Sequence, residues 1–215
     1  MIIEQIMTRN VLTLTPDDTV KAALMLMREH KIRHLPLIDE NRHVIGLVTE
    51  RDIKDATPSI LAPDLLKEKL HAPLSSIMVK NVMTGHPLDF VEDAAVLFYE
   101  HKIGCLPIED GGKLAGIITS TDLLHTMVEL TGANKPGSQI EIRVRNRPGV
   151  LYDVAGVFRS HNVNIHSVLV YPDPEDERYK ILVFRAATIN PIAMIENLKK
   201  EGLHVLWPNM PGMSP

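Results

Sequence analysis

The feature that most constrains the fold is an internal repeat. The tetrapeptide EHKI occurs at residues 29–32 and again at residues 100–103. When the chain is aligned on it, and after one deleted residue, the heptapeptides GLVTERD (46–52) and GIITSTD (116–122) also come into register. Self-similarity at a fixed spacing indicates one structural unit built twice. We therefore expect two copies of the same fold.

Each copy has the same order of expected elements. In the first, residues 10–14 form a β-branched run typical of a strand. Residues 15–30 carry helix-start signals, with Thr15 as the N-cap and Pro16 at the first helical position, and an apolar stripe at helical spacing. Two short strands follow, and a second helix then begins at the Thr of the heptapeptide. The prediction is β-α-β-β-α, a unit too small to bury its own sheet well, so we expect the two copies to pack together.

A third segment has a different pattern. Ile140, Ile142 and Val144 alternate with polar residues, which predicts a half-buried strand. The following elements complete a β-α-β-β-α-β order, the ferredoxin-like pattern. Because the helices pack on only one face of such a sheet, the other face must be buried by another subunit. We therefore expect a homodimer or a larger oligomer. The expected fold class is mixed α/β (α+β). We expect the two repeats over 1–56 and 77–132 and the third domain over 139–210. A connector over 57–76, with a short helix at 64–70, joins the repeats, and a linker over 133–138 precedes the third domain.

Composition excludes several classes of function. The formal net charge is −4 and the pI is about 6.2, which argues against a nucleic-acid partner. Apolar runs are too short for a membrane span or a signal peptide, so a cytoplasmic location is expected. The one cysteine, Cys105, is expected to be buried. His30 and His34 have the spacing of a helical metal pair, but Pro36 argues against a continuous helix, and no metal site is predicted.

Two family resemblances rest on short motifs. The tripeptides HLP (34–36) and CLP (105–107), with the two heptapeptides, resemble a tandem pair of CBS domains. NRPGVLYDVAGVF (146–158) and NVNIHSV (162–168) resemble an ACT domain. The resemblance implies ligand sensing without catalysis, because CBS pairs bind adenine nucleotides between their repeats and ACT domains bind amino acids near their first turn. The domain order is similar to that of bacterial acetoin-utilisation proteins, which implies a role in acetoin or acetate metabolism.

The heptapeptides also suggest chemistry of their own. Thr49 lies at the expected helix start, where free backbone N–H groups attract phosphate, and Asp52 can accept hydrogen bonds from ribose hydroxyls. Thr119 and Asp122 repeat the arrangement, and the resemblance gives all four residues these roles. A Thr followed three residues later by an acid is also close to a capping box, which needs no ligand. Both interpretations can hold together.

Further contacts are predicted around this motif. Gly46 and Gly116 allow another group to approach the strand closely. The resemblance places Arg33 and His34 near the bound base, where the second copy has Gly104 and Cys105, so the two clefts should differ. Arg33, His34 and Arg51 are predicted to contact phosphate, the alternative being that they are simply solvated. Because Thr121 stands where the first motif has Arg51, we expect the first motif to prefer more phosphate charge.

Three residues of the third segment are candidates for amino-acid binding. Asn146 and Gly149 flank the first turn, and Asn164 opens the second strand. Asn amides both donate and accept hydrogen bonds, which suits an amino acid. The alternative is local, since Asn and Gly are ordinary turn formers. A domain that only dimerises is equally compatible with the sequence.

The leading prediction is a non-enzymatic cytoplasmic regulator without a resident cofactor. Its regulatory ligand is AMP, ATP or a related adenosyl compound, and its candidate partners are a second copy, an amino acid and a metabolic enzyme. One alternative is a scaffold that binds an enzyme without any ligand, and another is an amino-acid sensor acting through the ACT-like segment. An enzyme is disfavoured because binding folds occupy the whole chain.

Overall fold

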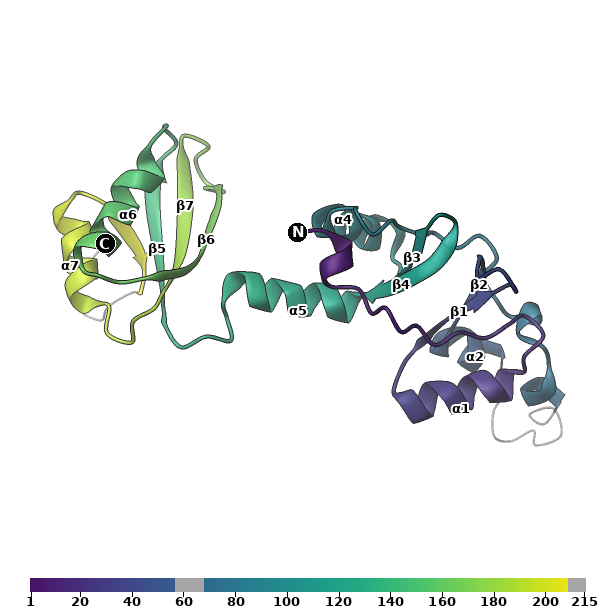
Figure 1. The fold of residues 1–215 in the computed structure, drawn as a ribbon. Coiled ribbons are helices and arrows are strands. Elements are labelled where there is room, and N and C mark those ends of the chain that lie inside the picture. Colours follow the sequence, from purple (N-terminus) through teal and green to yellow (C-terminus); the bar gives the residue numbers. More distant parts are fainter. Residues whose placement is uncertain (57–67, 209–215) are drawn as a thin grey trace. The chain divides into compact units, whose positions relative to one another are not determined.

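The computed structural model describes residues 1–56 and 68–208, which fall into two compact units, Met1–Leu124 and His125–Pro215 (Figure 1). The boundary between the units falls within helix α5 (Ser120–Thr131). Most of the connector expected at 57–76, including much of its short helix at 64–70, lies outside the described residues, although residues 68–71 are helical.

The first unit contains the same elements twice. The first copy consists of η1 (Ile3–Gln5), α1 (Val20–His30), β1 (His34–Ile38), β2 (Val44–Thr49) and α2 (Glu50–Ala56). The second consists of η2 (Leu74–Ser76), α4 (Val91–His101), β3 (Cys105–Asp110), β4 (Lys113–Thr119) and α5. In each copy the two strands pair as an antiparallel hairpin. The predicted duplication is thus confirmed.

The first strand expected in each copy is much shorter than predicted. Leu14 makes a single parallel bridge to Leu37, and Gly85 makes the equivalent bridge to Ile108. Leu14 donates to Pro36 O at 3.3 Å and accepts from Ile38 N at 3.0 Å. The run therefore contacts the hairpin at one residue and does not extend it by a full strand.

The first long helix begins later than predicted. Its N-cap is Thr19, whose hydroxyl accepts from Ala22 N at 3.2 Å, and Thr15 is not a helix cap. Instead, the Asp18 carboxylate accepts from the backbone N and the hydroxyl of Thr15, at 2.7 and 2.9 Å. These bonds close a turn over residues 15–18, so Thr15 and Asp18, which were expected to begin the helix, stabilise that turn instead. Of the predicted stripe of Val20, Ala23, Leu24 and Met27, Leu24 is partly buried and the other three are buried.

The two copies exchange their leading segments. Ile3 and Met7 pack into the core of the second copy, beside Phe98 and Leu106. Leu74, which precedes the second copy, packs into the core of the first. Backbone bonds follow the same exchange, because Thr8 pairs with Ile117 of β4 and Val79 pairs with Leu47 of β2. The start of each copy is thereby held against the hairpin of the other.

The second unit is a four-stranded antiparallel sheet with the order β6-β7-β5-β8. Its elements are β5 (Ser138–Arg145), α6 (Val150–Ser160), β6 (Ile165–Pro172), β7 (Tyr179–Ala186), α7 (Ile192–Lys200) and β8 (His204–Trp207). Ile140, Ile142 and Val144 belong to the buried core with residues of both helices, and the rings of Phe158 and Phe184 lie 4.6 Å apart. This is the predicted ferredoxin-like arrangement.

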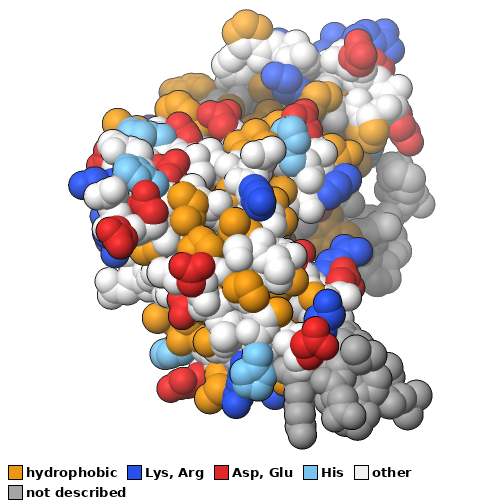
Figure 2. Space-filling model, turned by 90° about the vertical axis from the view of Figure 1, so that its right-hand side faces the viewer, with side chains coloured by type: hydrophobic (Ala, Val, Ile, Leu, Met, Phe, Trp, Pro, Cys, Tyr) orange, Lys and Arg blue, Asp and Glu red, His pale blue; other side chains and the backbone are white. Residues whose placement is uncertain are grey.

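Charged side chains of both signs share the face drawn in Figure 2. On the face drawn in Figure 2, Lys and Arg side chains are interspersed with Asp, Glu and hydrophobic ones, and no extended basic area is present there. In the part of the chain that the structure describes, no helix has the length and apolar character needed to cross a membrane.

Candidate functional site

Each heptapeptide forms a reciprocal cap at the start of a helix. Asp52 Oδ2 accepts from the backbone N and the hydroxyl of Thr49, at 2.8 and 2.7 Å, while Asp52 N donates to Thr49 Oγ1 at 3.2 Å. Thr119 and Asp122 repeat this geometry, with distances of 2.7, 2.6 and 3.4 Å. The capping interpretation of the motif is therefore confirmed in both copies. It does not exclude a ligand, because the same four residues also face cavities.

The first cavity has a volume of about 560 Å³ and contains the Thr49–Asp52 cap. Leu47, Val79, Val82, Met83 and Ile103 supply its apolar walls. The remaining lining residues are polar, small or ionisable: Arg33, His34, Thr49, Glu50, Arg51, Asp52, Asn81, Lys102, Gly104, Cys105 and Ser120.

The second cavity has a volume of about 320 Å³ and contains the Thr119–Asp122 cap. Val11, Leu12, Ile32 and Ile117 are its apolar residues. The others are Thr8, Asn10, Lys31, Arg33, His34, Thr119, Thr121 and Asp122.

The two cavities are related by the internal repeat. Each combines the Thr–Asp cap of one copy with an Asn and a Lys-Ile loop of the other: Asn81 and Lys102 in the first cavity, Asn10 and Lys31 in the second. The exchange of leading segments produces this mixing. Our sequence reasoning did not select these Asn and Lys residues as site residues. Their identity in the two aligned copies was the signal that could have found them.

The repeat symmetry breaks at one pair of positions. Arg33 and His34 line both cavities, whereas their equivalents Gly104 and Cys105 line the first cavity and are not part of the second. The His34 ring lies across Gly104, because a Cβ placed on that glycine would be 2.9 Å from His34 Nε2. Large side chains at both positions would collide, which explains the small residue in the second copy.

The two equivalent ionisable groups are both kept neutral. Burial lowers the pKa of His34, Arg33 lowers it further, and Asp52 opposes these effects in part. Burial raises the pKa of the Cys105 thiol to about 12. Cys105 is only 3% exposed, as expected for a buried apolar residue. A protonated thiol is a poor nucleophile, so Cys105 acts as a wall of the cavity.

Other predicted residues have mainly structural contacts. Gly46 and Gly116 are not among the described residues that line the two cavities. A Cβ on Gly46 would lie 2.6 Å from Met78 Sδ, so the group that approaches this strand closely is a methionine of the other copy. Arg51 lines the first cavity and also pairs with Asp55 at 3.7 Å, but both side chains are well exposed and the pair contributes little.

The candidates in the second unit have local roles. Asn146 N donates to Arg178 O at 2.8 Å. Gly149 is the N-cap of α6 with φ 83°, a left-handed conformation that favours glycine. Asn164 Oδ1 accepts from Ile165 N at 2.9 Å. These contacts agree with the turn-former alternative, and amino-acid binding by the three residues stays a prediction.

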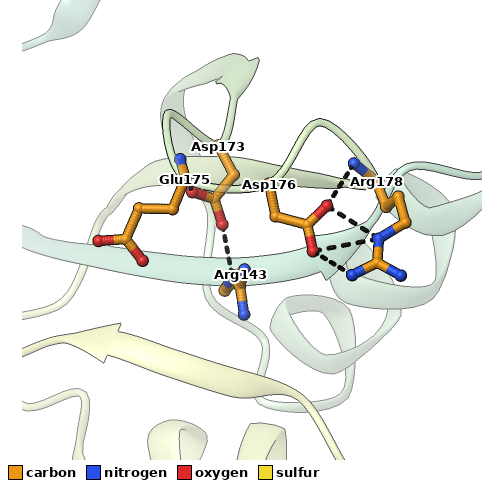
Figure 3. Close-up of polar contacts among 5 residues, drawn as sticks. All are labelled: Arg143, Asp173, Glu175, Asp176 and Arg178. Carbon is orange, nitrogen blue, oxygen red and sulfur yellow. Dashed lines mark hydrogen bonds and ion pairs between the residues drawn. The ribbon is translucent and has the colours of Figure 1, made fainter.

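A cavity of about 310 Å³ in the second unit includes none of these three residues. Its lining includes Arg143 and Asp173, and Figure 3 shows the Arg143 side chain of β5 paired with Asp173 in the loop before β7. The pKa of Asp173 is lowered, first by the hydrogen bond from Glu175 N and then by Arg143. In the same loop, hydrogen bonds from Arg178 lower the pKa of Asp176 to about 2. These contacts order the loop.

Comparison with known proteins identifies both units. Residues 3–59 and 74–129 match the CBS domain model, and residues 138–202 match the ACT domain model. A CBS domain-containing protein of Dictyostelium discoideum is 32% identical over 144 residues, which cover 64% of this chain and 99% of that protein. Inosine-5'-monophosphate dehydrogenase of Aquifex aeolicus is 36% identical over 117 residues, but these are 54% of this chain and only 22% of the enzyme.

Three solved structures resemble the CBS-like part of the chain. AcuB, an acetoin utilization protein from Vibrio cholerae, has a TM-score of 0.54 and 31% identity, over 63% of this chain and 98% of that chain. CBSX2 in complex with AMP has a TM-score of 0.52 and 28% identity, over 59% and 96% of the two chains. The CBS domain pair of MJ0100, in complex with 5'-methylthioadenosine and S-adenosyl-L-methionine, has a TM-score of 0.52 and 26% identity, over 59% and 99%.

Proposed function

The chain belongs to the CBS-domain family, with a tandem CBS pair followed by a C-terminal ACT domain, and we propose that it is a regulatory protein that binds an adenine nucleotide or a related adenosyl compound. The observation that carries the proposal is the pair of repeat-related cavities. Each joins a Thr–Asp cap from one copy to an Asn and a Lys from the other. A ligand there contacts both copies at once and can therefore affect how they pack.

The chemistry of the first cavity suits an adenosyl ligand. Its volume lies within the range of small-molecule sites, about 300–1,000 Å³. Apolar side chains such as Val82 and Ile103 can pack against the base, and the Asp52 carboxylate can accept hydrogen bonds from ribose hydroxyls. Arg51 and Lys102 carry the positive charge that a phosphate group needs. The AMP complex of CBSX2 and the adenosyl complexes of MJ0100 support the same ligand class.

Regulation follows if the ligand favours one packing of the two copies over another. The similarity to AcuB supports an output in acetoin or acetate metabolism. Enzymes such as inosine-5'-monophosphate dehydrogenase also contain a segment like this one, but the chain corresponds to 22% of that enzyme, so we propose that it is not itself catalytic. A cytoplasmic location, a homodimer and a metabolic enzyme as partner stay predictions.

Thermal unfolding with AMP and with ATP tests the proposal, because a ligand that binds the native state raises the midpoint. We expect either nucleotide to raise the midpoint of the wild-type chain. The double variant Asp52→Asn/Asp122→Asn keeps an oxygen that can accept the capping bonds but removes both carboxylates, so the increase should largely disappear while the ligand-free midpoint stays near that of the wild type. No shift with any adenine nucleotide would favour the ligand-free scaffold instead.

A further inference from the structure

The two cavities share one wall, built from Arg33 and His34 of the first copy. Both residues line the first cavity and the second. The wall is held from two sides, because Arg33 O accepts from Glu50 N of α2 at 2.9 Å and the His34 ring lies against Gly104 of the second copy. The equivalent carbonyl of Gly104 accepts from Ser120 N at 3.2 Å, so the backbone follows the repeat while the side chains do not.

Because Arg33 has no arginine as its equivalent in the second copy, the two cavities share one guanidinium where an exact repeat would supply two. Gly104 stands at the position equivalent to Arg33 and has no side chain to offer either cavity. In the first cavity the fixed cations are Arg33, Arg51 and Lys102. In the second they are Arg33 and Lys31. Among the residues that the structure describes, Arg33 is thus the one arginine or lysine common to the two sets, and the second cavity depends on it more.

We propose that Arg33 and His34 couple the two cavities, so that an adenine nucleotide bound in one weakens the binding of a second nucleotide in the other. This inference rests on the proposed function. A phosphate that engages Arg33 from one side leaves less of its positive charge for the other side, and the two bound anions also repel each other. The backbone of the shared wall and the His34 ring are held by α2 and Gly104, so the Arg33 side chain extends from a fixed point between the two cavities. The coupling is therefore negative and reciprocal.

Calorimetric titration of the full chain with AMP tests this. Asp52→Asn and Asp122→Asn each disable one cavity and report the affinity of the remaining one measured alone. In the wild type we expect two binding steps. The cavity that fills second should bind AMP about fivefold more weakly than the same cavity does in the single variant that leaves it intact. Arg33→Met should weaken AMP binding about threefold in the first cavity and about tenfold in the second. It should also reduce the difference between isolated and combined sites, leaving only the part that comes from direct repulsion between the two bound anions.

Two lysine variants serve as matched controls, since each lysine lines one cavity. Lys102→Met should weaken AMP binding only in the Asp122→Asn background, and Lys31→Met only in the Asp52→Asn background. Arg33→Met should act in both backgrounds. An effect of Arg33→Met in one background alone, or wild-type steps equal to the isolated affinities, would overturn the inference and leave nucleotide binding intact. A wild-type chain that binds no AMP would overturn the inference alone, and one that binds no AMP, ATP or S-adenosyl-L-methionine would overturn the proposed function as well.

Discussion

The two CBS repeats share their helix caps and differ in the wall between their cavities. The Thr–Asp cap occurs in both with nearly the same distances. The glycine of each heptapeptide also has the same packing partner, a methionine of the other copy. In contrast, Arg33 and His34 of the first copy correspond to Gly104 and Cys105 of the second. The features that the two copies share are therefore explained by folding. The difference at Arg33 and His34 changes which charged side chains line each cavity.

A residue that is kept in both copies can be kept because each copy must fold. The Thr–Asp pairs meet that condition as caps, and the glycines meet it as contact points for Met78 and Met7. Evidence for a ligand comes instead from the way the cavities mix the two copies.

The largest predicted effect tests the packing of the two glycines. A Cβ on Gly116 would meet Met7 Sδ at 2.5 Å and the backbone oxygen of Thr8 at 3.2 Å, whereas one on Gly46 would meet only side-chain atoms, the nearest being Met78 Sδ at 2.6 Å. Gly116→Ala should therefore lower the free energy of unfolding by about 2–3 kcal/mol and Gly46→Ala by about 1 kcal/mol, as chemical denaturation would measure.

The control for this prediction is the methionine. Met7→Ala should remove part of the overlap, so the double variant Gly116→Ala/Met7→Ala should lose less stability than the sum of the single variants. Equal losses for the two glycine variants would mean that the copies pack their glycines alike.

A smaller effect separates capping from binding. Asp52→Ala and Asp122→Ala each remove an acceptor at a helix start and should lower the free energy of unfolding by about 1 kcal/mol. Asp→Asn at either position keeps an oxygen acceptor and should cost only a few tenths of that amount. Denaturation curves of the four variants without nucleotide would measure the difference. If Asn costs as much as Ala, the carboxylate charge matters to the cap more than its geometry.

A third contrast concerns pH and compares His34 with Cys105. Because the folded state lowers the pKa of His34 below its usual 6.5, the unfolded chain binds a proton more readily, and stability falls as the pH drops through 6.5. The folded state raises the pKa of Cys105 from 9.0 to about 12, so stability falls as the pH rises above 9.0.

Variants at the two positions isolate these trends. His34→Gln should remove part of the acid-side loss of stability, and Cys105→Ala part of the alkaline-side loss. Unfolding free energies measured across the pH range would show each change, and each variant is the control for the other. A variant that alters the opposite side of the pH profile would contradict the assignment.

Local patterns predicted most of the fold. The duplication, most of the buried helix positions and the ferredoxin-like sheet followed from spacing, because apolar periodicity decides which face of an element is buried. Ala95 and Leu151 were expected in the buried stripes but are exposed. The start of α1 did not follow, since Thr15, Pro16 and Asp18 suit a tight turn as well as a helix start. Sequence could not choose between them, because Thr19 provides an equally good cap four residues later.

The candidate site was predicted only in part. The repeat alignment brought out Thr49, Asp52 and their equivalents, but not their neighbours Asn81 and Lys102. Those neighbours come from the other copy, and the exchange of leading segments depends on long-range backbone pairs such as Thr8 with Ile117. Nor does a single sequence show that His34 lies across Gly104, which is a tertiary contact.

The most direct test of nucleotide binding in the two repeat-related cavities is a native mass spectrum of the chain with AMP. We predict up to two AMP molecules per wild-type chain, one for Asp52→Asn, one for Asp122→Asn and none for the double variant. The same spectrum would report the number of chains in the assembly. A double variant that still binds AMP with the wild-type stoichiometry would show that the nucleotide lies elsewhere and would contradict the assignment of both cavities.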